Sequence, residues 1–189
     1  MRWEHLTSDR FAQAVIDCKG TCLLSLGVLE RHGPHLPLGT DTLHGHHICC
    51  QAAQLEPAIV LPPWYFGQIY EARCFPGTIT LPPTMLVDLL LTLMDEVGRN
   101  GLTKIILHVP HGGNNALAPF LAQCQLHAPN PYQVYVLPLG AGLNDDEKKH
   151  YHAIFDSPGG HAGEGETSSI LDICPESVDT DAYQNQTAP

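Results

Sequence analysis

The stretch TCLLSLGVLERHGPHLPLGTD, residues 21–41, decides the fold of this chain. Its first part, residues 21–28, is a nearly continuous apolar run of strand length, which is typical of a strand buried on both faces of a parallel sheet. Pro34 and Pro37 exclude a regular helix directly after this run. We therefore expect a buried strand that ends in a stiff, polar loop.

Outside this stretch, apolar strands continue to alternate with amphipathic helices. Helical spacing predicts helices at residues 8–18, 42–55, 83–100, 116–127 and 166–174, and apolar runs predict strands at 59–61, 104–109 and 132–139. The Pro-rich segment 62–83 and the polar segment before the last helix are expected to be loops. Such alternation implies right-handed crossovers, so we expect an α/β fold, a three-layer α/β/α sandwich with a mostly parallel sheet.

No repeat or linker divides the chain, so we expect one domain at residues 1–177 and a C-terminal tail at 178–189. The formal charge of -11 and the scattered Lys and Arg residues exclude a basic nucleic-acid surface. The seven Cys residues include no CxxC pair, which favours reduced thiols over disulfides or a thiolate zinc site. With no apolar leader or membrane-length run, we expect a cytoplasmic protein without a membrane partner.

Polar residues gather where the predicted strands end, which is where parallel sheets bind their ligands. Glu30 and His32 follow the first strand and are two residues apart, so both side chains can point the same way. Asp41 stands where the N-cap of the next helix is expected, and a capping Asp alone needs no metal. Two carboxylates and an imidazole converging at one strand end, however, suit zinc, manganese or iron.

Two later segments carry further candidate residues. The segment HGGNN, residues 111–115, follows the strand predicted at 104–109, and its His111 would add an imidazole. Glycine there would let the backbone approach a substrate or metal closely. The segment HAGEGETS, residues 161–168, precedes the last helix. Taken singly, these segments are better explained by turn geometry, a solvated loop histidine and a helix-dipole partner.

Taken together, these segments resemble the creatininase family of metal-dependent amidohydrolases. The resemblance rests on ERHGPHLPLGTD at 30–41, FPGT at 75–78, HGGN at 111–114, HAG at 161–163 and ETS at 166–168. The first motif is long and specific, and the motifs span most of the chain. The resemblance implies a creatininase-like fold.

The resemblance also implies a ligand set for two divalent metal ions per chain, which could be zinc, manganese or iron. In this arrangement Asp41 bridges the two ions, Glu30 and His111 bind one of them, and His32 binds the other. Glu166 is implied as a further ligand.

The chemistry implied by the family is hydrolysis of an amide C–N bond in a small molecule, such as a cyclic amide or a formamide. A hydroxide shared by the two ions attacks the carbonyl carbon, and His161 is the catalytic residue that protonates the departing nitrogen. Thr78 and Gly112 match positions that line the substrate pocket. The resemblance further implies a homo-oligomer, with a hexamer as one possible form.

Some positions depart from the pattern of creatininase itself. Gly112 and Gly113 replace a Tyr and a Glu, so creatinine is not the expected substrate and formamides or small peptide-like precursors fit better. Arg31 replaces a Gln and either pairs with an acidic substrate group or faces solvent. His44 and His47 lie one turn apart and could bind metal, although a solvated or supporting role is favoured. The alternatives to an enzyme are a metal-binding protein and an inactive family member with an assembly role.

Overall fold

The computed structural model describes residues 1–127, 129–138, 144–155 and 160–182. Its sheet contains four strands, β1 (Thr21–Ser25), β2 (Ile59–Val60), β3 (Lys104–His108) and β4 (Gln133–Leu137). All neighbouring strands are parallel, in the order β2-β1-β3-β4. The parallel sheet predicted from the apolar runs is therefore confirmed, with strands somewhat shorter than the runs.

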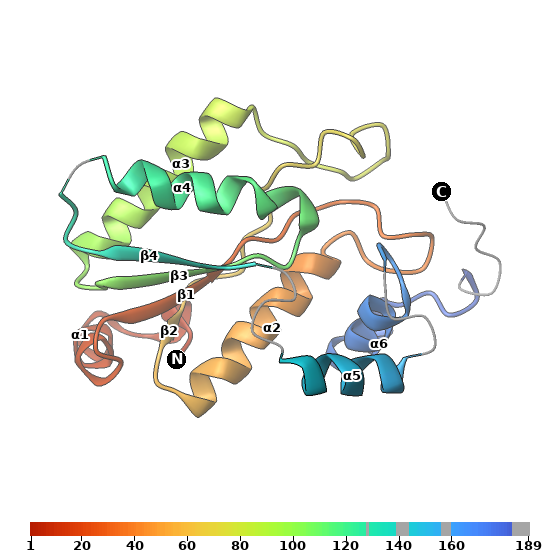
Figure 1. The fold of residues 1–189 in the computed structure, drawn as a ribbon, viewed down its shortest axis with the longest axis horizontal. Helices are drawn as coiled ribbons and strands as arrows, with labels where there is room; N and C mark the ends of the chain where they lie inside the picture. The colour runs from red at the N-terminus through yellow and green to blue at the C-terminus, as the bar shows by residue number, and fades with distance from the viewer. Residues whose placement is uncertain (128, 139–143, 156–159, 183–189) are drawn as a thin grey trace.

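Helices cover both faces of this sheet, so the three-layer prediction is also confirmed. They are α1 (Ser8–Asp17), α2 (Thr40–Leu55), α3 (Pro83–Arg99), α4 (Leu117–Gln125), α5 (Asp145–Ile154) and α6 (Glu164–Ile173), with short 3-10 turns η1 (Trp3–His5), η2 (Gly112–Asn115) and η3 (Pro175–Ser177). Figure 1 shows α3 and α4 on one face of the sheet and α2 on the other. None of the helices in the described part is long and apolar enough to span a bilayer.

Burial on both faces explains the continuous apolar runs. On one face Leu24 and Leu107 belong to a large core cluster that includes Leu90 of α3 and Leu121 of α4. On the opposite face a smaller cluster joins β1 and β2 to α2, for example through Leu23, Val60 and Cys49. Each buried Leu contributes roughly 1.5–3 kcal/mol relative to exposure, so the two clusters hold the strand ends at fixed positions.

Helix α2 begins earlier than the sequence predicts. Its N-cap is Gly39 and its first residue is Thr40, whose hydroxyl donates to the carbonyl of Pro37 at 2.7 Å. Asp41 therefore lies inside the first turn, and the prediction that it caps the helix is wrong. Because the Asp41 carboxylate does not cap the helix, it is free to contact side chains at the carboxyl end of the sheet.

Helix α5 lies where a polar loop was expected, and that expectation is wrong. Asn144 accepts hydrogen bonds from the backbone N–H groups of Asp146 and Glu147, and the Glu147 side chain accepts one from the Asn144 N–H. This reciprocal pair is a capping box, a recognisable helix start. The helix was missed because its charged residues hide the helical period.

The expected loop between β2 and α3 is present and is tied to the strand ends. Isolated bridges pair Leu26 with Trp64 and Leu29 with Ile79. Of the expected tail at 178–189, the Asp179 N–H donates to the carbonyl of His35, and residues 183–189 lie outside the described residues.

A buried histidine at the end of β3 makes stability depend on pH. Burial and the neighbouring His44 lower the pKa of His108 to about 4, and its Nδ1 lies 3.1 Å from the Ser25 hydroxyl. In the unfolded chain His108 takes up a proton near pH 6.5. Between about pH 6.5 and 4 the unfolded chain therefore binds more protons than the folded chain, so the free energy of unfolding decreases as the pH falls.

Replacing His108 with Gln is expected to remove up to about 3 kcal/mol of this pH-dependent loss. Denaturant unfolding of both proteins at pH 7 and pH 4.5 measures the difference. Equal losses in the two proteins would show that His108 is not the group responsible.

Candidate metal centre

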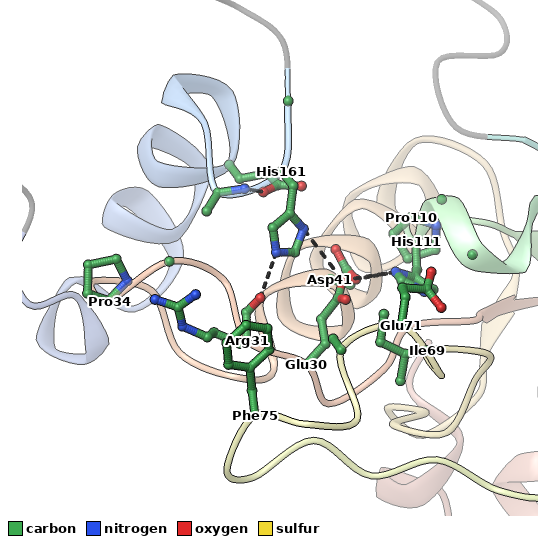
Figure 2. Close-up of a pocket in the computed structure, with 17 residues that line it drawn as sticks. Glu30, Arg31, Pro34, Asp41, Ile69, Glu71, Phe75, Pro110, His111 and His161 are labelled. Carbon is green, nitrogen blue, oxygen red and sulfur yellow. Dashed lines mark hydrogen bonds and ion pairs between the residues drawn. The ribbon is translucent and has the colours of Figure 1, made fainter. Parts of the chain in front are cut away.

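Side chains from three separate elements meet at the carboxyl end of the sheet (Figure 2). Glu30 and His32 follow β1, Asp41 comes from the first turn of α2, and His111 follows β3. These four residues are 3%, 1%, 4% and 5% exposed, respectively. Glu166 approaches from α6. The structure thus brings the five predicted ligands together, while their role as ligands stays a prediction.

The contacts between them are close. His111 Nδ1 lies 2.9 Å from Asp41 Oδ2 and 3.1 Å from Glu30 Oε1. His32 Nε2 lies 3.2 Å from Asp41 Oδ1 and 3.9 Å from Glu166 Oε2. Asp41 therefore presents one oxygen to each imidazole, and Oδ2 is buried with no hydrogen-bond donor among the described residues.

The outer nitrogen of each imidazole is bound to a backbone carbonyl, which can only accept a hydrogen bond. His111 Nε2 lies 2.8 Å from the carbonyl oxygen of Gln68, and His32 Nδ1 lies 3.3 Å from that of Glu30. In the neutral ring the proton then sits on the outer nitrogen. The inner nitrogen then carries the lone pair. That of His32 faces Asp41 Oδ1, and that of His111 lies close to Asp41 Oδ2 and Glu30 Oε1, so acceptor atoms lie beside acceptor atoms.

Two things can relieve this conflict, a second proton on each imidazole or a cation between the groups. Without a cation the protons are strongly held. Burial alone would lower the pKa of His111, but Asp41 and Glu30 raise it to about 10. Burial would likewise raise the pKa of Asp41, but His111 and His32 hold it well below its usual range. The buried carboxylates are therefore stable only next to positive charge. Neutral imidazoles whose outer N–H groups donate to carbonyls are the form of histidine that binds metal.

The described residues form three groups whose ligand atoms lie within 4.8 Å of one another, namely Glu30, Asp41 and His111, then His32, Asp41 and Glu166, and finally Glu30, His32 and His161. Asp41 belongs to the first two groups. This arrangement fits two cations that share Asp41.

One nitrogen of the His161 ring also contacts a backbone carbonyl oxygen, as in His32 and His111. Its Nε2 lies 2.6 Å from the carbonyl oxygen of Arg31, its Nδ1 lies 3.7 Å from Glu30 Oε1, and its ring lies against His32 with centroids 4.3 Å apart. Its side chain is 47% exposed, in contrast to the buried His32. A histidine at the boundary between site and solvent can exchange protons with both.

A family model for creatininase, described as creatinine amidohydrolase, matches residues 4–189. The chain belongs to the creatininase family. It is 31% identical over 166 residues to a mycofactocin precursor peptide peptidase of Mycolicibacterium smegmatis. This match covers 84% of this chain and 60% of that protein. The chain thus spans about 60% of the length of that curated relative.

Solved creatininase structures share the fold. One described as creatininase Mn superposes with a TM-score of 0.80 at 24% identity, covering 100% of this chain and 79% of its own. A variant described as the Zn-Zn type superposes with a TM-score of 0.77 at 24% identity, covering 96% and 75%. The creatininase-like architecture expected from the motifs is confirmed.

Within this creatininase-family site, the segment after His111 performs a positioning role that the sequence did not reveal. Asn114 is fully buried, its Nδ2 donates to the carbonyl of Leu26, and its Oδ1 accepts from the N–H of Gln68. It therefore joins the end of β1 to the loop whose carbonyl holds His111. A Cβ on Gly113 would lie 2.4 Å from His111 Nε2 and 2.5 Å from the Gln68 carbonyl oxygen.

A second unforeseen link positions Glu166. His35 Nε2 and the Thr167 hydroxyl are 2.8 Å apart, and both residues are buried. This contact joins the loop after β1 to α6. In addition, the Ala162 N–H donates to Glu166 Oε2 at 2.6 Å. The HAG and ETS motifs of the sequence thus act together to orient one carboxylate.

The site opens into a cavity of about 810 Å³. Gly112 lines it, and a Cβ there would meet nothing within 4 Å. Thr78, which was predicted to line the substrate pocket, is not among the residues that line this cavity. Its buried hydroxyl has no hydrogen-bond partner among the described residues. His47 contacts Gln51 at 3.2 Å, and neither it nor His44 belongs to a three-ligand group of the described residues.

Proposed function

We propose that this chain is a metal-dependent hydrolase that cleaves an amide C–N bond in a small molecule. The observation that carries the proposal is the orientation of His32 and His111, whose outer nitrogens are held by carbonyls while their inner nitrogens face buried carboxylates. That arrangement needs positive charge between the imidazoles and the carboxylates, which divalent cations bound by neutral imidazoles supply.

Two divalent cations would be held in adjacent positions. Glu30 and His111 would bind one and His32 and Glu166 the other, with one oxygen of Asp41 on each. Zinc, manganese and iron all accept such ligands, and the related creatininases are described with Mn and as a Zn-Zn type. When bound, such ions lower the pKa of water and polarise a carbonyl.

The protein itself would move the proton. Because Nε2 of His161 donates to the carbonyl of Arg31, Nδ1 of the neutral ring is the atom free to carry a proton. As water adds to the carbonyl carbon, this nitrogen would accept a proton from it, and as the C–N bond breaks it would deliver that proton to the departing amine. His32 packs against the same ring and keeps it facing the site.

The cavity fits a small amide. Its volume of about 810 Å³ lies in the usual range of ligand pockets, roughly 300–1,000 Å³. Gly112 leaves one wall open, so formamides and short peptide-like molecules fit at least as well as a flat cyclic amide. The name of the Mycolicibacterium smegmatis relative, a precursor peptide peptidase, supports the peptide-like class. A single-domain cytoplasmic homo-oligomer, in the form of a hexamer, belongs to the same proposal.

Replacing His161 with Ala tests turnover separately from metal binding. Because this side chain is half exposed and outside the Asp41-centred groups, both cations should remain, while kcat should fall by about 10²–10⁴-fold. Elemental analysis and rates on formamides, cyclic amides and short peptides measure the two effects. His127→Ala, an exposed histidine at the end of α4, is the matched control and should change neither.

If the wild-type chain binds metal but releases no acid or amine from any of these compounds, it is a metal-binding protein or an inactive family member. If His161→Ala loses its metal together with its rate, His161 is a ligand and not the proton carrier.

A further inference from the structure

Arg31 is the cavity residue whose side chain is always charged. It is the one Lys or Arg among the described lining residues, which otherwise include the acids Glu30, Asp41, Glu71 and Glu166. No described carboxylate forms an ion pair with its guanidinium, although the chain carries 20 acidic residues. A cation that no described carboxylate pairs with can bind an anionic group of a ligand.

The guanidinium has a defined position. Its Cζ lies 4.6 Å from the centroid of the Phe75 ring, and its backbone carbonyl accepts the hydrogen bond from His161 Nε2. A guanidinium stacked on an aromatic face keeps the N–H groups along its edge free. Those groups match the two oxygens of a carboxylate in a bidentate pair, which is stronger and more directional than a contact to a neutral amide.

The aromatic platform under Arg31 is part of the site wall. Gly77 has φ +84° and packs so closely that a Cβ would lie 2.3 Å from Leu38 Cδ1. The Ile79 N–H donates to the carbonyl of Leu29 at 3.2 Å, directly before Glu30. The turn that carries Phe75 is therefore fastened to the loop that carries the candidate ligands.

The two ends of the cavity differ in charge. Figure 2 shows Arg31 and Phe75 on one side of Asp41, with Pro34 beyond them, and His111 on the other side. In the metal-loaded protein Glu30, Asp41 and Glu166 would be neutralised by the cations they hold. The guanidinium of Arg31 therefore adds a positive group beside the candidate metal centre that can pair with a substrate carboxylate. Such a substrate would enter in one orientation, with its amide toward the candidate metal centre.

We propose that Arg31, supported by Phe75, forms a carboxylate subsite, and that the substrate is an amide with a free carboxylate, such as an N-acyl amino acid or a short peptide. This inference rests on the proposed amide hydrolysis. It gives Arg31 a role in specificity, because a neutral amide would leave its guanidinium unpaired.

The test compares acids with their neutral counterparts. N-acetylglycine, N-acetyl-β-alanine and N-acetyl-γ-aminobutyrate, each with its carboxamide, are assayed with the manganese-loaded protein. The wild type should favour the best acid, and Arg31→Gln should lower kcat/KM for that acid by about 10–100-fold while changing the carboxamide by less than about threefold. Arg73→Gln removes an exposed cation of the same loop outside the cavity lining and should change neither value.

An equal loss on acid and carboxamide would overturn the subsite, because Arg31 would then act only on the neighbouring Glu30 and His32. A wild-type preference for the carboxamides would also overturn it. If the wild type hydrolyses none of the compounds, the proposed hydrolysis fails for N-acyl amino acids and their carboxamides. The carboxylate subsite is then tested by measuring the affinity of the protein for the acids. Calorimetry of the three acids with metal-free protein should then show binding to the wild type at least about tenfold tighter than to Arg31→Gln, and equal affinities would overturn the subsite.

Discussion

Replacing Asp41 with Asn is expected to reduce the bound metal from two ions per chain to less than one and to lower kcat/KM by about 1,000-fold or more. Each oxygen of Asp41 faces a different imidazole, at 2.9 Å from His111 Nδ1 and 3.2 Å from His32 Nε2. The amide keeps the size of the side chain but removes its charge and one acceptor. Both candidate positions therefore weaken together.

Elemental analysis and rate measurements on the same sample decide the outcome. Asp88→Asn makes the same change at an exposed position on α3 and should keep full metal and full rate. Circular dichroism of the three proteins checks that each is folded. Two ions per chain in Asp41→Asn would contradict a shared carboxylate, and one tightly held ion would mean that Asp41 serves a single position.

Gly113→Ala is expected to have the second largest effect, although glycine carries no chemical group. The added Cβ would lie 2.4 Å from His111 Nε2 and 2.5 Å from the Gln68 carbonyl oxygen, so the hydrogen bond that orients His111 cannot survive unchanged. Metal affinity at the position of Glu30 and His111 should fall by about 10–100-fold, as it does when the partner of a ligating histidine is lost. Unfolding should also become easier by roughly 1–3 kcal/mol because the site is overpacked.

The neighbouring glycine provides the control. A Cβ on Gly112 would meet nothing within 4 Å, so Gly112→Ala should bind metal as the wild type does. Metal titrations followed by calorimetry compare the two variants. If both alanines leave the affinity unchanged, the Gln68 carbonyl does not orient His111.

The fold was largely predictable because its decisive pattern is simple. Strands buried on both faces need continuous apolar runs, and residues 21–28 and 104–109 have them. The start of α2 was less predictable, since Gly39 and Asp41 both resemble caps and tertiary contacts decide between them. Helix α5 shows the opposite problem, because its capping box at Asn144 was visible in the sequence while its charged surface suggested a loop.

The candidate site was predictable only in part. Glu30 and His32 lie a few residues beyond the end of β1 and His111 a few beyond the end of β3. Because neighbouring parallel strands end at the same edge, their meeting could be expected. The carbonyl of Gln68 that holds His111 could not be expected, because a backbone oxygen leaves no trace in the sequence. The stacking of Arg31 on Phe75 likewise depends on a turn more than 40 residues away in the chain, whose path only the structure reveals.

Anomalous diffraction at the zinc edge, from crystals of the zinc-loaded protein, locates the bound ions. We expect two peaks beside Asp41, one bound by Glu30 and His111 and the other by His32 and Glu166, at ligand distances of about 2.0–2.2 Å. Peaks found only elsewhere on the molecule, or no peak between the ends of β1 and β3 at full zinc loading, would contradict this expectation.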